Sequence, residues 1–311
     1  MLVSVLISNY NYARFLPEAI ESVFFQTYPH IETIVVDDGS TDDSRDVIAS
    51  YGDRLISVFK QNGGQTSALN AAFERSSGDL ICFLDADDAF EPTKVERVVA
   101  AARRIPEACL IHHQMQIVDG SGKAMHRPFP AWLPDGDIRA LVARTGGWFP
   151  RPLMSGLTFT RAYAERLFPV PDEQQSVERG RSHLLPIFVD TYLAGPAALL
   201  APVAGIQAPL TRYRVHETNM SFETQATSEG QLLRYRAEAD TLSTVMGEKF
   251  GESWPPRMED HLEYQLLRYA VGEVSWGSAI GRVMRCPYLP AIEKARQALR
   301  VSRKRHMVAA Q

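Results

Sequence analysis

Short apolar runs alternate with amphipathic segments along the N-terminal third of the chain. Runs of strand length occur at 2–8, 31–36, 55–59 and 80–84, and helical segments are expected between them at 17–26, 44–51 and 66–75. Strands that alternate with helices form mainly parallel sheets. This order therefore predicts an α/β fold, Rossmann-like, with helices on both faces of the sheet.

Polar residues follow three of these runs, at the points where the strands should end. Ser8 opens a polar loop after the first run, Asp38 follows the second, and Asp85, Asp87 and Asp88 follow the fourth. Ligands of open α/β sheets bind beyond the carboxyl ends of the strands. We therefore expect these side chains to gather at one edge of the sheet.

The cluster of Asp85, Asp87 and Asp88 suggests a metal ion. Carboxylates this close raise each other's pKa and destabilise the fold unless a cation lies between them. Oxygen ligands suit Mg²⁺ or Mn²⁺, and Mg²⁺ commonly shares its ligand shell with substrate phosphates. The alternative interpretation is a solvated turn rich in Asp, which is common after strands.

Three sequence blocks carry a family resemblance. They are VSVLISNYNYARFLPEAIESVFFQTYPHIETIVVDDGSTDDS, NGGQTSALNAAF and GDLICFLDADD. In this order and spacing they resemble the nucleotide-binding half of the family-2 glycosyltransferases, and weaker similarity continues through 152–161, 190–193 and 213–221. The resemblance implies the GT-A fold and an inverting, metal-dependent transfer of sugar from a nucleotide diphosphate sugar to an acceptor hydroxyl.

The resemblance also implies roles for single residues on the donor side. Asp38 would bind the nucleobase edge, with the backbone near Ser8 and Tyr10 lining the base pocket. Asp85 would reach the ribose or a metal-bound water, and Gln65 would approach the donor from its helix. For Gln65 and for Asn70, an ordinary polar helix surface is the alternative, and Asp37 is interpreted as a turn former.

The resemblance makes Asp87 the direct ligand of a divalent cation, Mg²⁺ or Mn²⁺, and lets Asp88 support the loop. His216 belongs to the element Tyr213-Arg214-Val215-His216, which would return to the donor site. There His216 would contact the metal or the diphosphate, with Arg214 as a nearby counter-charge. A structural histidine is the alternative.

Asp190 is the candidate catalytic base that takes the proton from the acceptor hydroxyl. It is a solitary carboxylate in the apolar segment 187–193, where burial would raise its pKa. A helix cap is the alternative, and Glu178 is the next candidate base. Ser155 and Gly156 resemble an acceptor-side turn, although Gly156 can instead serve backbone geometry alone.

Composition limits the classes of partner and the cell compartment that we expect for this protein. The formal charge of −4 argues against nucleic acid, and the odd number of cysteines, 3, suggests reduced thiols in a cytoplasmic protein. The chain opens on a strand, so we expect no leader peptide. No uncharged stretch reaches the roughly 18 residues of a membrane span; the apolar stretch 197–210 is short and is interrupted by Pro202 and Pro209.

The C-terminal part shows helical periodicity at 229–248, 260–274 and 291–305. We therefore expect a donor-binding half at 1–105, an acceptor-side half at 106–225 and a helical extension at 226–311. The last helix is basic and amphipathic, which suits peripheral contact with the inner face of an anionic membrane. Packing against the core or against a second copy in a homodimer is the alternative.

The predicted function is sugar transfer to a saccharide or lipid-linked acceptor in polysaccharide or glycolipid biosynthesis. A nucleotide-sugar-binding protein without transferase activity is the competing class. A phosphatase is disfavoured because its nucleophile would follow the first strand, and a dinucleotide oxidoreductase because that turn lacks G-x-G-x-x-G.

Overall fold

The computed structural model describes residues 1–145, 147–171, 189–216, 228–252 and 262–286, together with 294–295, 297–298 and 301. The chain divides into two compact units. The first comprises Met1–Ile138 and Pro150–Glu217, and the second Arg139–Phe149 and Thr218–Gln311.

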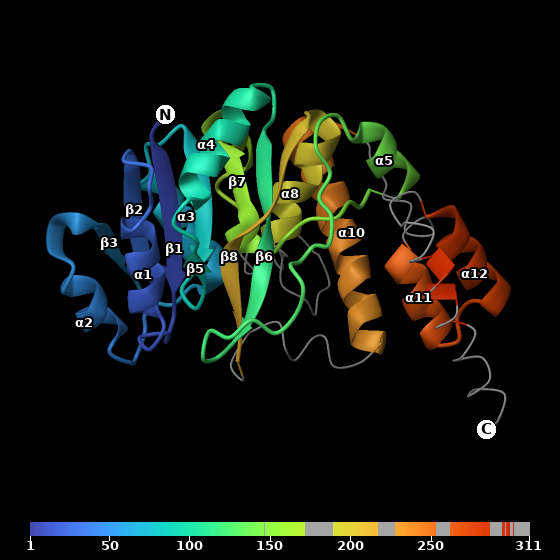
Figure 1. The fold of residues 1–311 in the computed structure, drawn as a ribbon, viewed down its shortest axis with the longest axis horizontal. Coiled ribbons are helices and arrows are strands. Elements are labelled where there is room, and N and C mark those ends of the chain that lie inside the picture. Colours follow the sequence, from blue (N-terminus) through green and yellow to red (C-terminus); the bar gives the residue numbers. More distant parts are fainter. Residues whose placement is uncertain are drawn as a thin grey trace. The chain divides into compact units, whose positions relative to one another are not determined.

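The first unit is built on a sheet of eight strands in the order β3-β2-β1-β4-β7-β6-β8-β5 (Figure 1). The strands are β1 (Val3–Asn9), β2 (Ile31–Asp37), β3 (Ile56–Phe59), β4 (Leu80–Asp85), β5 (Ala89–Phe90), β6 (Leu110–Asp119), β7 (Leu157–Thr160) and β8 (Val203–Val215). Strands β3, β2, β1 and β4 are parallel, as the alternating pattern predicts. The other half is mixed, because β7 is antiparallel to both β4 and β6 whereas β6 and β8 are parallel.

Helices cover both faces of this sheet, which confirms the predicted α/β class. They are α1 (Leu16–Phe24), α2 (Ser44–Ala49), α3 (Gly64–Glu74), α4 (Lys94–Arg104), α6 (Arg161–Leu167) and α8 (Val189–Leu200), with short 3₁₀ turns η1 (Gly52–Arg54) and η2 (Met154–Gly156). In Figure 1, α1 and α4 lie on one face of the sheet, whereas α3 contacts β1 and β2 from the other. The apolar stretch 197–210 forms the end of α8 and the start of β8.

Alternation along the strands explains the core between the sheet and these helices. Val3, Val5 and Ile7 of β1 are fully buried in one cluster with apolar residues of α1 and α4. Residues at every second position share a face of the sheet. In β4 this rule places Leu84 in the same cluster and directs the neighbouring Asp85 to the opposite face. The core thus sets which way the acidic strand end points.

The second unit is helical, as predicted for the C-terminal part. It contains α5 (Arg139–Arg144), α10 (Ser228–Phe250), α11 (Leu262–Ala270) and α12 (Trp276–Arg285). Leu262, Val283 and Cys286 form a small buried cluster within it. Of the predicted basic helix 291–305, the structure describes 294–295, 297–298 and 301, which are helical. Among the described helices, none combines the length and apolarity that crossing a bilayer would need.

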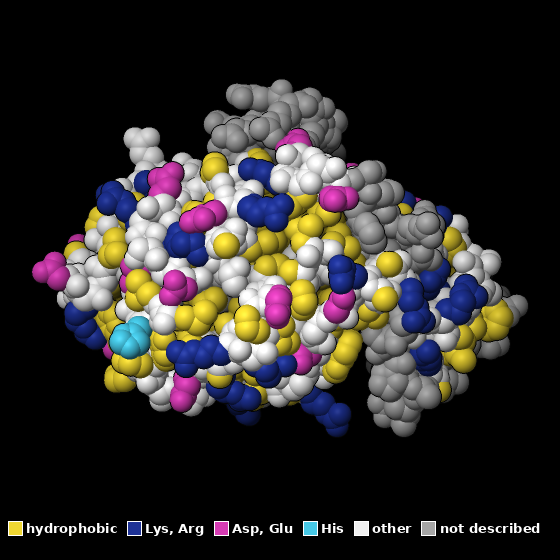
Figure 2. Space-filling view, turned by 90° about the horizontal axis from the view of Figure 1, so that it is seen from above, with side chains coloured by type: hydrophobic (Ala, Val, Ile, Leu, Met, Phe, Trp, Pro, Cys, Tyr) yellow, Lys and Arg dark blue, Asp and Glu magenta, His cyan; other side chains and the backbone are white. Residues whose placement is uncertain are grey.

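On the face seen in Figure 2, acidic and basic side chains are interspersed among apolar ones. The three cysteines, Cys82, Cys109 and Cys286, are buried and unbridged. Cys82 is fully buried in β4, as expected for a small core residue.

Candidate active site

The parallel half of the sheet brings three strand ends together. Ser8 of β1 is paired in register with Val36 of β2 on one side and with Asp85 of β4 on the other. Asp38 follows β2 directly, and its N–H donates to the carbonyl of Asn9. The polar loops predicted to converge therefore do so, because neighbouring parallel strands end at the same edge.

Asp37 anchors the two loops that follow β1 and β2. Its buried carboxylate accepts hydrogen bonds from the Asn9 amide at 3.0 Å, and from the Ser40 N–H and the Arg45 side chain at 3.2 Å each. Asn11 adopts a left-handed backbone conformation, with φ of 59°, and its side chain accepts from the Thr41 N–H. These contacts support the interpretation of Asp37 as a turn former.

Asp38 is buried, and both of its carboxylate oxygens are engaged within the protein. Oδ1 lies 2.5 Å from the Lys60 ammonium, and the N–H groups of Gly63 and Gly64 donate to the carboxylate at 3.1 and 2.8 Å. The side chain thus fixes the loop that leads into α3. Binding of a nucleobase by Asp38 stays a prediction, and it would have to share these contacts.

Asp85 lies close enough to Asp87 and to the candidate base Asp190 for their charges to affect it. Its N–H donates to the Ser155 hydroxyl at 3.0 Å, and the Gln65 amide donates to its Oδ1 at 3.5 Å. Burial, with the nearby charges of Asp87 and Asp190, raises the pKa of Asp85 to about 7. The structure therefore brings Gln65, Asp87 and Asp190 around one carboxylate.

Asp87 and His216 form a direct pair. The His216 Nε2 lies 3.0 Å from the Asp87 Oδ2, and both side chains are largely buried. Burial raises the pKa of Asp87, and the hydrogen bond from His216 opposes that rise. The His216 ring also packs on Phe15 and Tyr12, with ring centroids 4.7 and 5.6 Å away. Asp87 and His216, 129 residues apart in the chain, thus lie together, and contact of His216 with a metal or a diphosphate stays a prediction.

Asp88 is turned inward. Its Oδ1 accepts from the Arg214 N–H at 3.0 Å, and its Oδ2 is buried with no hydrogen-bond partner among the residues that the structure describes. Burial and the charges of Asp87 and Asp85 raise the pKa of Asp88 well above its ordinary value. Asp88 therefore ties the acidic loop to β8, in agreement with a supporting role.

Asp190 lies in the first turn of α8 and is half-buried. Its Oδ1 accepts from the Thr191 N–H at 2.9 Å, and Arg151 donates to the Thr191 hydroxyl at 2.7 Å. One carboxylate oxygen is thus engaged locally, as a helix-start residue would be. The alternative base, Glu178, lies outside the described residues.

Ser155 and Gly156 are buried in η2. The Ser155 hydroxyl accepts from Asp85, and its carbonyl accepts from the Thr211 hydroxyl at 3.1 Å. A Cβ on Gly156 would lie 2.4 Å from the Pro152 Cβ, so close packing requires glycine there. Both residues position the end of β4, and contact with an acceptor stays a prediction.

The residues fit a divalent cation in part. In the part of the chain that the structure describes, no group of three or more His, Cys, Asp and Glu side chains is arranged to hold a metal ion. Asp87 and His216 nevertheless offer two ligand atoms 3.0 Å apart. Neighbouring ligands of an octahedral ion with bonds of about 2.1 Å are separated by about 3 Å. The pair therefore fits a cation that completes its shell with water and substrate phosphates, as Mg²⁺ commonly does.

The sheet and its acidic edge define an α/β protein with a candidate active site at the carboxyl ends of its strands, and comparison with known proteins defines the family. The model of Glycosyl transferase family 2 matches residues 4–165. An uncharacterised glycosyltransferase of Nostoc sp. is 31% identical over 277 residues, which span 86% of this chain and 83% of the relative. The chain therefore belongs to glycosyl transferase family 2 and is a glycosyltransferase.

Other relatives share less of the chain. The putative teichuronic acid biosynthesis glycosyltransferase TuaG of Bacillus subtilis is 39% identical over 100 residues, which span 31% of this chain and 40% of TuaG. The structure of S. aureus TarS with UDP-GlcNAc matches with a TM-score of 0.61 at 15% identity, covering 92% of this chain and 82% of the TarS chain. The mannosyltransferase PcManGT of Pyrobaculum calidifontis, solved with GDP-Man and Mn²⁺, matches with a TM-score of 0.54 at 17% identity, covering 98% and 80%. These likenesses confirm the predicted GT-A fold.

Proposed function

We propose that this glycosyltransferase moves a sugar from a nucleotide diphosphate sugar to an acceptor hydroxyl, with inversion at the anomeric carbon and with the help of a divalent cation. The observation that carries the proposal is that the charges of Asp87 and Asp190 both act on Asp85. Asp87 and His216 lie on one side of it, and Asp190 influences its pKa from α8. We therefore propose that the donor site and the base lie at one edge of the sheet.

Each side chain has a defined task in this proposal. Asp87 and His216 hold the cation, and the charge that a bound cation supplies offsets the negative charge of the departing diphosphate. Asp190 accepts the acceptor hydroxyl proton at its carboxylate. The new bond joins the acceptor oxygen to the anomeric carbon, while the bond from that carbon to the diphosphate oxygen breaks on the opposite face. Opposite-face attack is what gives inversion.

The partners follow from the same proposal. UDP-GlcNAc and GDP-Man occupy the structurally similar proteins, so the donor here is a nucleotide diphosphate sugar of that kind. The name of TuaG supports a polysaccharide product, and the acceptor is a saccharide or a lipid-linked saccharide. We place the reaction in the cytoplasm, at the inner face of the membrane where lipid-linked acceptors are exposed. The division into donor half, acceptor half and helical extension is part of this proposal.

The test is sugar transfer by the wild-type protein and by Asp190→Asn. A panel of UDP- and GDP-sugars, screened by thermal shift with Mn²⁺ or with EDTA, selects the donor, because a ligand that binds only the folded state raises Tm. Asp190→Asn keeps the shape of the side chain but accepts no proton. We expect its transfer rate to fall by about 10²-fold or more, with donor affinity unchanged.

Asp46→Asn is the matched control, since Asp46 also lies in the first turn of a helix but is exposed on α2. Its transfer rate should equal that of the wild type. Normal transfer by Asp190→Asn would remove Asp190 from the mechanism. Donor binding with no transfer or nucleotide release by the wild-type protein would favour the alternative, a nucleotide-sugar-binding protein.

A further inference from the structure

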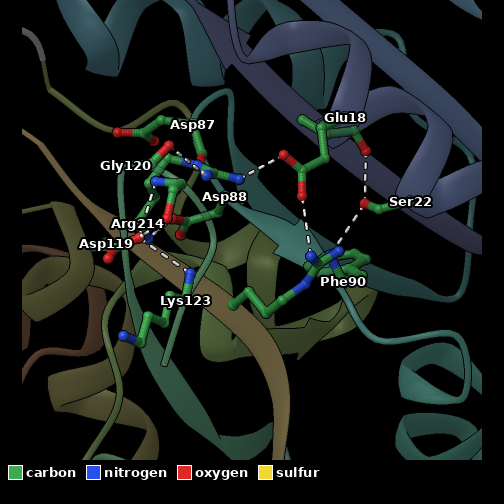
Figure 3. Close-up of polar contacts among 12 residues, drawn as sticks. Glu18, Ser22, Asp87, Asp88, Phe90, Asp119, Gly120, Lys123 and Arg214 are labelled. Atoms are coloured by element: carbon green, nitrogen blue, oxygen red, sulfur yellow. Dashed lines mark hydrogen bonds and ion pairs between the residues drawn. The ribbon is translucent and has the colours of Figure 1, made fainter. Parts of the chain in front are cut away.

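Arg214 is almost completely buried at the end of β8 and joins three separate segments (Figure 3). Its Nε donates to the Asp87 carbonyl at 3.0 Å, its Nη1 to the Gly120 carbonyl at 3.2 Å, and its Nη2 lies 2.5 Å from the Glu18 carboxylate. A buried guanidinium is costly unless its donors are matched. Here each nitrogen of the guanidinium group has an acceptor.

Asp87 is held at two points by the same strand end. The Arg214 side chain binds its carbonyl, and His216 binds its carboxylate. Arg214 is the penultimate residue of β8 and His216 follows the strand directly, and both side chains contact Asp87. The Arg214 N–H also binds Asp88. The main chain of the acidic loop is therefore fixed relative to the strand that carries His216.

The start of α1 completes this arrangement. Phe15 contacts both partners, with its ring 4.7 Å from the His216 ring and 5.2 Å from the Arg214 guanidinium. Glu18, in the first turn of α1, binds Arg214 and also Arg212, at 3.1 Å. The same helix follows directly on the loop after β1, at the expected nucleobase side.

Within the metal-assisted function proposed above, we infer that Arg214, oriented by Glu18, is a positioning residue that holds Asp87 and His216 in the arrangement a divalent cation needs. Arg214 itself does not take part in the chemistry. Its side chain donates to the Asp87 and Gly120 carbonyls and pairs with Glu18, and its role as a counter-charge near the donor stays a prediction. Groups that orient metal ligands typically change metal affinity by about 10–100-fold when they are replaced.

Arg212 provides a matched control on the same strand. It also pairs with Glu18, and it lies 3.4 Å from Glu91, but no described contact joins it to Asp87 or Asp88. Lysine keeps the positive charge of either arginine but lacks the planar fork that reaches several acceptors. Arg214→Lys and Arg212→Lys therefore differ in whether the acidic loop loses its support.

The experiment measures Mn²⁺ binding to each full-length variant in the presence of UDP, from the electron paramagnetic resonance signal of free Mn²⁺. We expect Arg214→Lys to weaken Mn²⁺ binding about tenfold or more, and Arg212→Lys to leave it within about twofold. UDP affinity in EDTA should be equal in all three proteins. Excess Mn²⁺ should restore most of the transfer rate of Arg214→Lys, which a general loss of structure would not allow.

The outcomes separate this inference from the proposed function. If wild-type protein with UDP does not bind Mn²⁺, both the metal-assisted function and the positioning role are wrong. If the wild type binds Mn²⁺ and Arg214→Lys binds it equally well, or both arginine variants lose affinity alike, only the positioning role is wrong. Should Arg214→Lys fail to fold, Glu18→Gln replaces it, with Glu91→Gln as its control. Weaker Mn²⁺ binding in Glu18→Gln alone supports the inference, and equal binding in the two overturns it.

Discussion

Lys94 is fully buried, although lysine side chains are ordinarily exposed to solvent. It opens α4, with its ammonium 3.8 Å from the centre of the Phe90 ring. Burial lowers the pKa of Lys94, and the neighbouring Cys82 opposes that change. The folded state therefore carries the cost of burying this amine.

Replacing Lys94 should stabilise the protein. Because the pKa of Lys94 is lower in the folded state than in the unfolded state, the unfolded state takes up the proton more readily below the ordinary lysine pKa. The resulting cost to folding is present at neutral pH and disappears only as pH rises toward about 10.4. Lys94→Met, with an adaptable apolar side chain, should raise the free energy of unfolding at pH 7 by about 1–3 kcal/mol.

Urea denaturation at pH 7 measures the effect of Lys94→Met, with Lys123→Met at an exposed position as the control. A lower midpoint for Lys94→Met than for the wild type would show that the amine contributes more through the Phe90 ring than its burial costs.

The location of a site residue was predictable where the residue belongs to a recognisable sequence motif. Two separate motifs predicted that Asp87 would bind the metal and that His216 would contact the metal or the diphosphate. The structure brings the two residues within hydrogen-bond distance, and their roles toward the metal stay predictions. The contact between Glu18 and Arg214 was not predictable, since it joins residues 196 positions apart. Glu18 has the sequence context of an ordinary acidic residue in the first turn of a helix. Only the fold shows that it faces an arginine.

At the scale of elements, prediction succeeded where one face of each strand is continuously apolar. The run 31–36 corresponds to β2 (Ile31–Asp37), and the run 2–8 to β1 (Val3–Asn9). The mixed half of the sheet was harder to predict from its pattern. β6 contains polar residues and two register shifts against β8 around Gln114, and β8 continues through Pro209. Irregular pairing interrupts the alternation on which strand prediction depends.

The loop between β3 and α3 yields a prediction about Asp38. Its carboxylate accepts from Lys60, Gly63 and Gly64, so Asp38→Asn puts an amide donor opposite groups that are themselves donors. A mismatched buried group costs about 1–3 kcal/mol. We expect the free energy of unfolding to fall by that amount and nucleotide affinity to fall with it.

Denaturation and calorimetry with UDP on the same samples separate the two roles of Asp38. Lower UDP affinity at unchanged stability would assign Asp38 to the nucleobase rather than to the loop. Asp43→Asn, at the exposed N-cap of α2, is the control and should change neither quantity.

At the scale of the whole molecule, two sets of buried groups respond to pH in opposite directions. The raised pKa values of Asp85 and Asp88 mean that the folded state binds protons more tightly than the unfolded state, so lowering pH stabilises the fold through them. His112 and His113, consecutive buried residues of β6, have the opposite effect. Burial lowers the pKa of His112 to about 4 and that of His113 to about 3. The stability of the wild-type protein in mild acid is the balance of the two sets.

Replacing His113 with a side chain that does not titrate measures how much this histidine contributes to the pH dependence of stability. Because the folded pKa lies below the unfolded value of about 6.5, the unfolded state alone takes up this proton as pH falls from about 6.5 toward 3. His113→Asn retains a polar atom near the Nδ1 position, which lies 2.8 Å from the Gln114 carbonyl, but has no titrating group. Relative to this variant, the wild type should lose about 1.4 kcal/mol of unfolding free energy per pH unit across that range.

Urea denaturation at pH 7, 6, 5 and 4 measures the difference, with His126→Gln as the exposed control. Parallel pH profiles for His113→Asn and the wild type would mean that His113 takes up its proton equally in the folded and unfolded states, which would contradict the lowered pKa.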